Sequence, residues 1–337
     1  RAAFNRARAP SASIAHFGLE EGDLDTVFEA GSEVGIGAAS LRDIIAHLEE
    51  TYCHSIGIEY MYIREPERWE WFKDHIELAN RPVLSEAEKK QIFKKLNQAT
   101  VFEEFLQKKF VGQKRFSVEG GESLLPALDA IVERGSELGG KEFIIGMAHR
   151  GRLNTLAHIL NKPYADIFEE FAGKAYDHGD DFDCDVKYHM GYSTDFEADT
   201  GVPIHITLAP NPSHLEAVDP VVGGIARARI DREHHDENAV VPILVHGDAA
   251  VAGQGVVYEV VQMAQLDGYR TGGTIHLAVN NQVGFTTNYL HAPSSIYCTD
   301  LAKSTHCPVF HVHADAAEAV VTAIRIAPAS PQPLHRD

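Results

Sequence analysis

The sequence is poor in cysteine, has no long apolar run and carries a deficit of positive charge. Its four cysteines form no CxxC pair, which favours a reducing compartment over a disulfide framework. No apolar stretch approaches the roughly 20 residues that a membrane helix needs, so the pattern speaks against a membrane protein. The formal net charge of −19 makes nucleic acid an unfavourable partner, because both molecules would be negative.

The chain also lacks an initiator methionine, and no acidic residue precedes Glu20. A processed targeting peptide can leave such a composition, although a chain truncated at its start is the simpler interpretation. Residues 1–19 are therefore assigned as an N-terminal extension. The total of 337 residues suits one large or two medium domains with a sizeable core.

Residues 20–112 are predicted to form a helical accessory region. Ser40 and Ser85 are placed as helix N-caps, each followed by an acidic residue three positions on and by helical apolar spacing. The aromatic cluster Trp69, Trp71 and Phe72 is interpreted as core packing rather than as a stacking platform. No catalytic pattern occurs in this region, so we expect it to serve packing or interaction.

Residues 113–326 alternate apolar runs with amphipathic segments. The apolar runs at 142–147, 203–208, 241–245, 274–279 and 309–315 predict strands. Strands alternating with helices predict an α/β domain whose mostly parallel sheet has about five strands and is doubly wound. Residues 327–337 hold three prolines without periodicity, and this tail is expected to end the domain.

Polar residues follow two of the predicted strands directly. One run ends in Gly247-Asp248 and another stops at Asn280-Asn281, with a small-residue turn and a helix between them. The carboxyl ends of parallel strands are where α/β sheets bind ligands. A carboxylate and an amide oxygen suit Mg2+, and a helix start offers N–H groups to a diphosphate. The pattern indicates a Mg2+-diphosphate site, with Asp248 as a plain helix cap the alternative.

Further candidates follow other strand ends. His149 and Arg150 come directly after the run 142–147 and offer one titratable and one permanent cation to an anionic group. An Arg150 paired with a surface acid is the alternative. The proline-framed turn after 203–208 holds Ser213, for which a plain N-cap role remains open, and His214, which could simply pack or face solvent.

Five longer motifs together resemble one family. GMAHRGRLNTL, DVKYHMGYSTDF, APNPSHLEAVDPVV, HGDAAVAGQG and NNQVGFTTN are similar to segments of the thiamine-diphosphate-dependent E1 component of 2-oxoglutarate dehydrogenase. The resemblance runs from about Ile14 to about Ile326. It implies that 113–326 is the diphosphate-binding domain of that family, with thiamine diphosphate and Mg2+ as cofactors.

The resemblance also implies an activity and partners. The activity would be oxidative decarboxylation of 2-oxoglutarate, with transfer of the succinyl group to the lipoyl group of the E2 partner, dihydrolipoyl succinyltransferase. The cofactor would carry this chemistry. A homodimer is implied, located in the cytoplasm of a bacterium or in the mitochondrial matrix of a eukaryote.

Metal and cofactor positions carry over residue by residue. Asp248 and Asn281 match the family's Mg2+ ligands, with the backbone carbonyl of Val283 as the third. Ala249 and Ala250 match positions that contact the cofactor beside that aspartate.

The remaining cofactor and substrate positions come from three other motifs. Arg150 and the turn residues Ser213, His214 and Leu215 match positions around the diphosphate and thiazolium.

Two histidines are implied on the substrate side. His149 and His189 match histidines that hold the 2-oxo acid and stabilise the charge developing on it, and Ser193 lies near them in the family.

The chain departs from the family pattern at two places. Ala249 stands where the usual GDG…NN motif has glycine, a variant that fits the 2-oxoglutarate branch. The family's second domain supplies the glutamate that activates the aminopyrimidine, and residues 327–337 do not resemble the continuation toward that domain. We therefore expect a diphosphate-binding half that is not competent alone.

Three alternatives stay open at this point. The chain could be a non-catalytic fragment or binding module of the same fold. It could serve 2-oxoadipate, since one methylene changes selectivity only modestly. A Mg2+-nucleotide enzyme is disfavoured, because no GxxxxGK[ST] loop is present.

Overall fold

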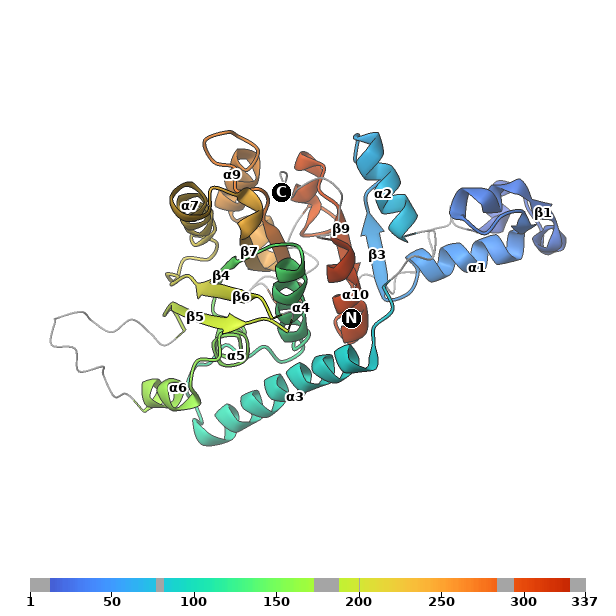
Figure 1. Cartoon of the computed structure of the whole chain (residues 1–337). Helices are drawn as coiled ribbons and strands as arrows, with labels where there is room; N and C mark the ends of the chain where they lie inside the picture. The colour runs from blue at the N-terminus through green and yellow to red at the C-terminus, as the bar shows by residue number, and fades with distance from the viewer. Residues whose placement is uncertain (1–12, 77–81, 173–187, 200, 284–293, 328–337) are drawn as a thin grey trace.

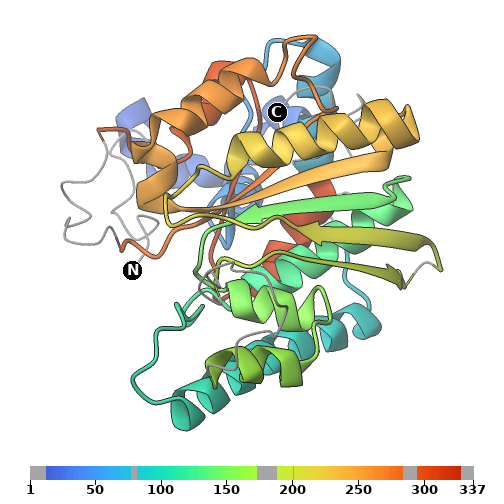
Figure 2. The ribbon, with the colours of Figure 1, turned by 90° about the vertical axis from the view of Figure 1, so that its left-hand side faces the viewer.

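The centre of the molecule is a five-stranded sheet with the order β5-β6-β4-β7-β8. The computed structural model describes residues 13–76, 82–172, 188–199, 201–283 and 294–327. The strands are β4 (Glu142–Met147), β5 (Tyr192–Glu197), β6 (Pro203–Leu208), β7 (Val240–Gly247) and β8 (Ile275–Val279). β5 runs antiparallel to β6, and the other neighbouring pairs are parallel. The prediction of an α/β fold with about five mostly parallel strands is confirmed (Figure 2).

The strand order changes direction between β4 and β7. The chain goes from β4 to β6 on one side and then crosses to β7 and β8 on the other side. Loops that leave the carboxyl ends of β4 and β7 therefore diverge, and such a point is where an α/β sheet offers a ligand crevice. The register pairs Met147 with Val245 and Gly247 with Val279, so these strand ends share one edge.

Helices cover both faces of the sheet. On one face, Leu125 and Leu128 of α4 join Phe143 in a buried cluster. On the other face, Val222 of α7 packs with Ile144. Neighbouring residues of β4 thus serve opposite cores, as strand geometry requires. The helices of this part are α4 (Leu124–Glu137), α5 (Arg152–His158), α6 (Tyr164–Phe171), α7 (Asp219–Arg229), α8 (Asp248–Gly253), α9 (Gly255–Met263) and α10 (Ala317–Ile326).

The N-terminal region is helical and its helix starts are capped as predicted. Ser40 accepts a hydrogen bond from the Asp43 N–H at the start of α1, and Ser85 forms a reciprocal capping box with Glu88 at the start of α3. The long helix α3 lies along the outside of the α/β part, beside α4 and α10 (Figure 1). The helices are α1 (Leu41–Tyr52), α2 (Pro66–Ile76) and α3 (Glu86–Lys109).

A separate two-stranded sheet joins the N-terminal helical region to a segment close to the end of the α/β part. β3 (Ile56–Glu59) pairs antiparallel with β9 (Val309–Val312). The expectation that residues 309–315 extend the main sheet is wrong, and β5 is the fifth strand instead. Phe72 is fully buried beside this pair, with Trp69 and Trp71 packed against its cluster, so the aromatic cluster is core packing as predicted.

Two predicted connections differ from the structure. Residues 249–255, expected as a turn, fall mostly in helix α8 and reach the start of α9. The alanines favour helix, and Asp248 suits a helix N-terminus. The turn at Ser213 is not a helix start. α7 begins at Asp219 with Pro220 in its first turn, where a proline costs no hydrogen bond and causes no kink.

Short elements complete the described chain. β1 (Val27–Phe28) pairs with β2 (Ala39–Ser40). Single 3-10 turns occupy Ile14–Phe17, Glu21–Asp25, Glu29–Val34, Glu237–Ala239 and Asp300–Thr305, and a π turn occupies Ile230–His234. Among the described residues, no helix has both the length and the apolar character to span a bilayer.

Candidate functional site

Asp248 stands at the carboxyl end of β7, in the first turn of α8. Its carboxyl is half-buried, and burial raises its pKa above the ordinary value. Nearby backbone N–H groups act in the opposite direction and lower the pKa, including those of Ala249, Gln282 and Asn281. The carboxyl therefore lies next to the segment that leaves β8. A partly desolvated acid surrounded by N–H donors gains stability in its charged form when a cation is bound.

Asn281 follows β8, the strand next to β7. Its amide oxygen accepts a hydrogen bond from the Val283 N–H at 3.0 Å, and Gln282 between them adopts a left-handed φ of 58°. This turn brings the Asn281 oxygen and the backbone of Val283 together. One carboxylate and neutral oxygens from an adjacent strand end form a donor set that fits Mg2+.

The first turn of α8 follows Asp248 immediately. Ala249 is half-buried and Ala250 is 8% exposed, so both side chains lie close to the sheet edge without filling it. Gly247 precedes the helix with extended backbone and without a side-chain cap. The first N–H groups of this short helix, including that of Ala249, face the Asp248 carboxyl.

The two predicted histidines come together across this edge. His149 follows β4 and His189 precedes β5, and their ring centroids are 5.5 Å apart. Phe116 lies 4.6 Å from His149, and Tyr188 lies 4.9 Å from Phe116, centroid to centroid. Aromatic rings thus wall the histidine pair on one side.

His149 offers an unused polar atom. Its Nδ1 is buried and has no hydrogen-bond partner within the part of the chain that the structure describes. Burial lowers the pKa of His149, and the nearby His189, Arg152 and Arg150 lower it further. The imidazole is therefore neutral near pH 7, and an orphaned buried nitrogen fits a ligand group at this point.

Arg150 is exposed beside this pair. Its Nη1 donates to the Ser117 carbonyl at 2.9 Å, and no ion pair of Arg150 occurs among the described residues. The alternative of a surface ion pair therefore finds no support, and the guanidinium retains further donors for an anion.

Arg152 was missed in the sequence analysis. It is fully buried and donates to three main-chain carbonyls, those of Met147, Met190 and Ala209, at 2.6 to 3.2 Å. These carbonyls belong to the end of β4, the segment after His189 and the end of β6. Burial lowers the pKa of Arg152 to about 10, so it remains charged at neutral pH. The repeated arginine of HRGR was a signal for a cation, but nothing in the motif distinguishes the buried arginine from the exposed one.

The turn after β6 presents Ser213, His214 and Leu215 at the same edge. All three are exposed. Ser193 lies on β5, where its hydroxyl is 3.1 Å from that of Thr207 and its side chain is exposed. The structure thus brings Ser193 near this edge, while the hydroxyl engages β6.

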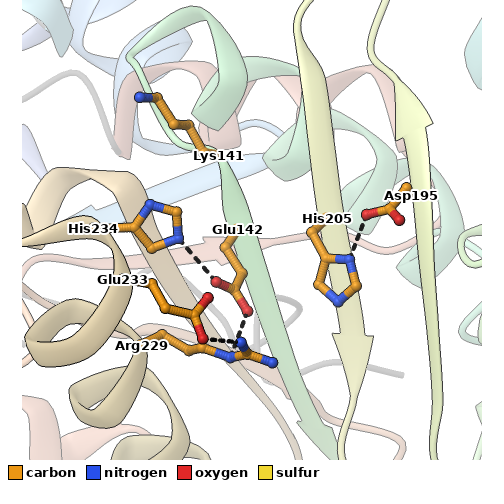
Figure 3. Close-up of a pocket in the computed structure, with 7 residues that line it drawn as sticks. All are labelled: Lys141, Glu142, Asp195, His205, Arg229, Glu233 and His234. Carbon is orange, nitrogen blue, oxygen red and sulfur yellow. Dashed lines mark hydrogen bonds and ion pairs between the residues drawn. The ribbon is translucent and has the colours of Figure 1, made fainter.

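A separate hollow of about 240 Å³ lies at the opposite edge, where β4 and β6 begin. Figure 3 shows two groups of paired side chains in it, one around Glu142 and one formed by His205 and Asp195, while Lys141 points away from both. Glu142 contacts Arg229 at 3.1 Å and His234 at 3.0 Å, and His205 contacts Asp195 at 2.6 Å. Because these charges are already paired, the candidate site is the edge that carries Asp248.

The comparisons with known proteins show the family to which the chain belongs. The sequence profile of the dehydrogenase E1 component family matches residues 94–332, which is more than half of the chain. This chain belongs to the dehydrogenase E1 component family. The matched segment of this E1 family member contains every strand of the main sheet and every candidate site residue.

Curated relatives show which members of the family the chain resembles. The chain is 47% identical over 323 residues to the 2-oxoglutarate dehydrogenase E1 component of Cupriavidus necator, covering 94% of this chain and 34% of that protein. It is 48% identical over 325 residues to the protein of the same name from Azotobacter vinelandii, covering 95% and 34%. A multifunctional 2-oxoglutarate metabolism enzyme of Mycolicibacterium vanbaalenii is 47% identical over 327 residues, covering 94% and 26%. The E1 family member therefore spans about a third, or less, of the length of these relatives.

Proposed function

We propose that this chain is the diphosphate- and Mg2+-binding part of a thiamine-diphosphate-dependent 2-oxoglutarate dehydrogenase E1. The observation that carries the proposal is the position of Asp248 at the end of β7 beside the Asn281–Gln282 segment that leaves β8. The identity of 47–48% to relatives named 2-oxoglutarate dehydrogenase E1 component supports the choice of branch. The doubly wound thiamine diphosphate-binding arrangement is part of this proposal.

The chain's own residues would bind the metal and orient the cofactor. Asp248 and Asn281 would hold Mg2+, with the Val283 carbonyl as a third ligand. Ala249 and Ala250, whose small side chains allow close approach at the start of α8, would contact the cofactor beside Asp248. Thiamine diphosphate, when bound, supplies the carbon nucleophile and the electron sink for decarboxylation of a 2-oxo acid.

The histidines belong to the substrate side. His149 presents its unpaired Nδ1 from a neutral ring, and such a ring can exchange a hydrogen bond with a substrate oxygen in either role. His189, 7% exposed and next to it, would orient the 2-oxo acid. Arg150 would add a permanent cation close to the anionic groups, and Ser193 would lie at the rim. The turn residues Ser213, His214 and Leu215 would cover the thiazolium side.

Membership of the same family suggests the substrate, the partners and the domain boundaries. We propose 2-oxoglutarate as substrate, the lipoyl group of dihydrolipoyl succinyltransferase as acceptor and a homodimer as the assembly. A cytoplasmic location in a bacterium rests on the family alone. The domain division is proposed as 1–19 extension, 20–112 helical accessory region, 113–326 diphosphate-binding domain and 327–337 tail.

Calorimetry with a variant tests the cofactor half of the proposal. Thiamine diphosphate is titrated with Mg2+ into the chain and into a form extended to the relatives' full length. We expect Mg2+-dependent binding to the extended form, and its loss in Asp248→Ala with far-UV circular dichroism unchanged. Equal affinity in Asp248→Ala and the parent would remove Asp248 as a metal ligand.

An activity assay tests the reaction. The extended form should reduce an artificial electron acceptor when given 2-oxoglutarate, thiamine diphosphate and Mg2+. The chain as printed should not. Faster turnover with 2-oxoadipate than with 2-oxoglutarate would make the longer acid the substrate. No turnover with either acid would indicate that the protein is a binding module and not an enzyme.

A further inference from the structure

A buried chain of three side chains crosses the sheet under the candidate site. His246 Nδ1 lies 2.6 Å from a Glu216 carboxyl oxygen, and His246 Nε2 lies 2.9 Å from His276 Nδ1. Glu216 is 6% exposed, His246 is 2% exposed and the Nε2 atom of His276 is buried. The mechanism described above uses none of these three groups.

Each member of this chain belongs to a segment that carries a proposed site residue. Glu216 follows Leu215 directly in the turn after β6. His246 lies in β7, two residues before Asp248, and His276 lies in β8, the strand that leads to Asn281. The two histidine rings stack nearly in parallel, at 10° between planes. The chain therefore connects three separate segments that would meet the cofactor.

The turn at Glu216 is held in an unfavourable backbone conformation. Glu216 has a φ of 67°, a value that residues other than glycine rarely adopt. Conformations of this kind persist where surrounding contacts determine them. The bond from the Glu216 carboxylate to His246 is such a contact, because it fixes the side chain of the turned residue to the sheet.

The hydrogen-bond directions are consistent from end to end. Burial, and then the adjacent His246, lower the pKa of His276 to about 3, so this ring is neutral. If His276 Nδ1–H donates to His246 Nε2, then His246 Nδ1–H donates to Glu216. The unpaired His276 Nε2 is then an acceptor, and a buried orphaned acceptor is more acceptable than an orphaned donor.

Asp219 completes the surroundings of the carboxylate. Burial raises the pKa of Asp219 to about 9, with the neighbouring Glu216 carboxyl contributing in the same direction. Asp219 is therefore a neutral acid at neutral pH. One negative charge, not two, has to be accommodated beside His246.

A metal ion is the competing explanation for this cluster. Glu216, Asp219 and His246 place possible ligand atoms within 4.8 Å of one another. However, the 2.6 Å from Glu216 to His246 is a hydrogen-bond distance. Two ligands around one tetrahedral cation at bond lengths of about 2.0–2.2 Å stand more than about 3 Å apart. The geometry favours a hydrogen-bonded chain.

We propose that Glu216, His246 and His276 form a positioning relay that fixes the 213–215 turn, Asp248 and Asn281 relative to one another for cofactor binding. The relay rests on the proposed function, because its role is defined by the cofactor. Its members contact no substrate or cofactor; they act through the segments that do. Outer groups of this kind orient ligands and, when removed, lower metal affinity by about 10- to 100-fold.

Paired substitutions of His276 separate positioning from packing. His276→Leu removes the bond to His246 while filling similar space. His276→Asn keeps an amide near the position of Nδ1 and can still donate. We expect His276→Leu, and likewise Glu216→Leu, to weaken Mg2+-dependent thiamine diphosphate binding by at least about 10-fold, with His276→Asn close to the parent. Glu216→Gln, which keeps an acceptor, should lie between.

A packing variant controls for lost stability. Ile131→Ala lies in α4, on the opposite face of the sheet, and lowers the melting temperature without touching the relay. We expect it to leave cofactor affinity unchanged even where its melting temperature falls as far as that of His276→Leu. Equal weakening by Ile131→Ala and His276→Leu would reduce the relay to general stability and overturn the proposal.

The calorimetry is run on the full-length enzyme, with thiamine diphosphate and Mg2+ as the probes. If the parent binds and the leucine variants bind equally well, the relay is wrong and the proposed function stands. If the parent itself shows no Mg2+-dependent binding, the proposed function fails and the relay fails with it. A 2-oxoglutarate KM that stays at the parent value in His276→Leu, while the cofactor constant rises, would support the relay.

Discussion

His246 and His276 are joined by a hydrogen bond of 2.9 Å between ring nitrogens on two adjacent parallel strands. The register pairs His246 with Ala278 and His276 with Leu244, so the two histidines are diagonal neighbours on one face of the sheet. Side chains therefore connect β7 and β8 in addition to the backbone ladder. The two strands, which lead to Asp248 and to Asn281, cannot shift against each other without breaking this contact.

Asp248→Asn should separate metal binding from folding. Burial raises the pKa of the Asp248 carboxyl in the folded chain, so this group favours folding at low pH, and the contribution is lost as the pH rises through the folded pKa. We expect the isosteric amide to leave the melting temperature of the cofactor-free protein at pH 8 equal or higher. Mg2+-dependent thiamine diphosphate affinity should fall by about 100-fold or more, measured by calorimetry, since a neutral ligand replaces a charged one. A lower melting temperature with intact affinity would contradict both statements.

His189→Ala should reduce turnover more than cofactor binding. His189 lies beside His149 and precedes β5, which β6 and β4 separate from β7 and β8 in the sheet. We expect kcat with 2-oxoglutarate to fall by about 10²-fold or more, the range for a positioned group that exchanges protons or hydrogen bonds, with thiamine diphosphate affinity nearly unchanged. Ser193→Ala serves as the matched control, because its hydroxyl already bonds Thr207, and its effect should be much smaller. Loss of cofactor affinity with turnover preserved would move His189 out of the substrate side.

Arg152→Lys should destabilise the fold although it keeps the charge. The guanidinium donates to three carbonyls from three separate segments, and a lysine cannot reproduce this planar fork. We expect the free energy of unfolding in urea to fall by about 3 kcal/mol, because buried carbonyls lose partners. Arg150 is exposed and donates to the Ser117 carbonyl, so Arg150→Lys is the control and should change the free energy of unfolding by less than about 1 kcal/mol. Similar urea midpoints for both variants would show that the buried fork is dispensable.

Glu133→Gln should stabilise the protein in a pH-dependent way. Burial, then the nearby Asp199 carboxylate, raise the pKa of Glu133 to about 7. A carboxyl whose folded pKa lies above its unfolded value favours folding at low pH, and this contribution is lost as the pH rises from about 4.5 to about 7. We therefore expect Glu133→Gln to raise the melting temperature at pH 8 and to leave it nearly unchanged at pH 4. Gln can still accept the Asp199 N–H bond that Glu133 accepts at 2.9 Å. An equal rise at both pH values would indicate a packing effect instead.

The strands show which features of the sheet the sequence pattern predicts and which it does not. The segments at 142–147, 203–208, 241–245 and 274–279 are correctly predicted as strands. β4 and β7 are nearly continuous apolar runs, as buried parallel strands are, and β6 alternates buried and partly exposed residues. The run at 309–315 has the same local character but pairs with β3 outside the main sheet. β5 is the fifth strand of the main sheet instead. It is an antiparallel edge strand whose residues alternate between partly buried and exposed, so its sequence looks like a turn or an extended segment. Pairing partners are a long-range property that a local pattern does not contain.

The helix starts likewise separate what a local sequence pattern predicts from what long-range contacts decide. Ser40 and Ser85 cap α1 and α3 as predicted, since a cap depends on residues within one turn. Ser213 does not cap α7, which begins at Asp219. There the chain is held by the Glu216 bond to β7, a contact over 30 residues that overrides the local capping signal.

The sequence alone determined the α/β class, the strand ends that carry Asp248, Asn281 and His149, and the family of motifs, because all of these lie in short stretches with fixed local spacing. Only the tertiary structure decided which charged and titratable side chains are buried. Arg152, Glu216 and His276 look like ordinary polar residues in the sequence, and each is set by neighbours from distant segments. Burial and hydrogen-bond partners arise when strands pack side by side, so the groups that hold the site together become visible only in the folded chain.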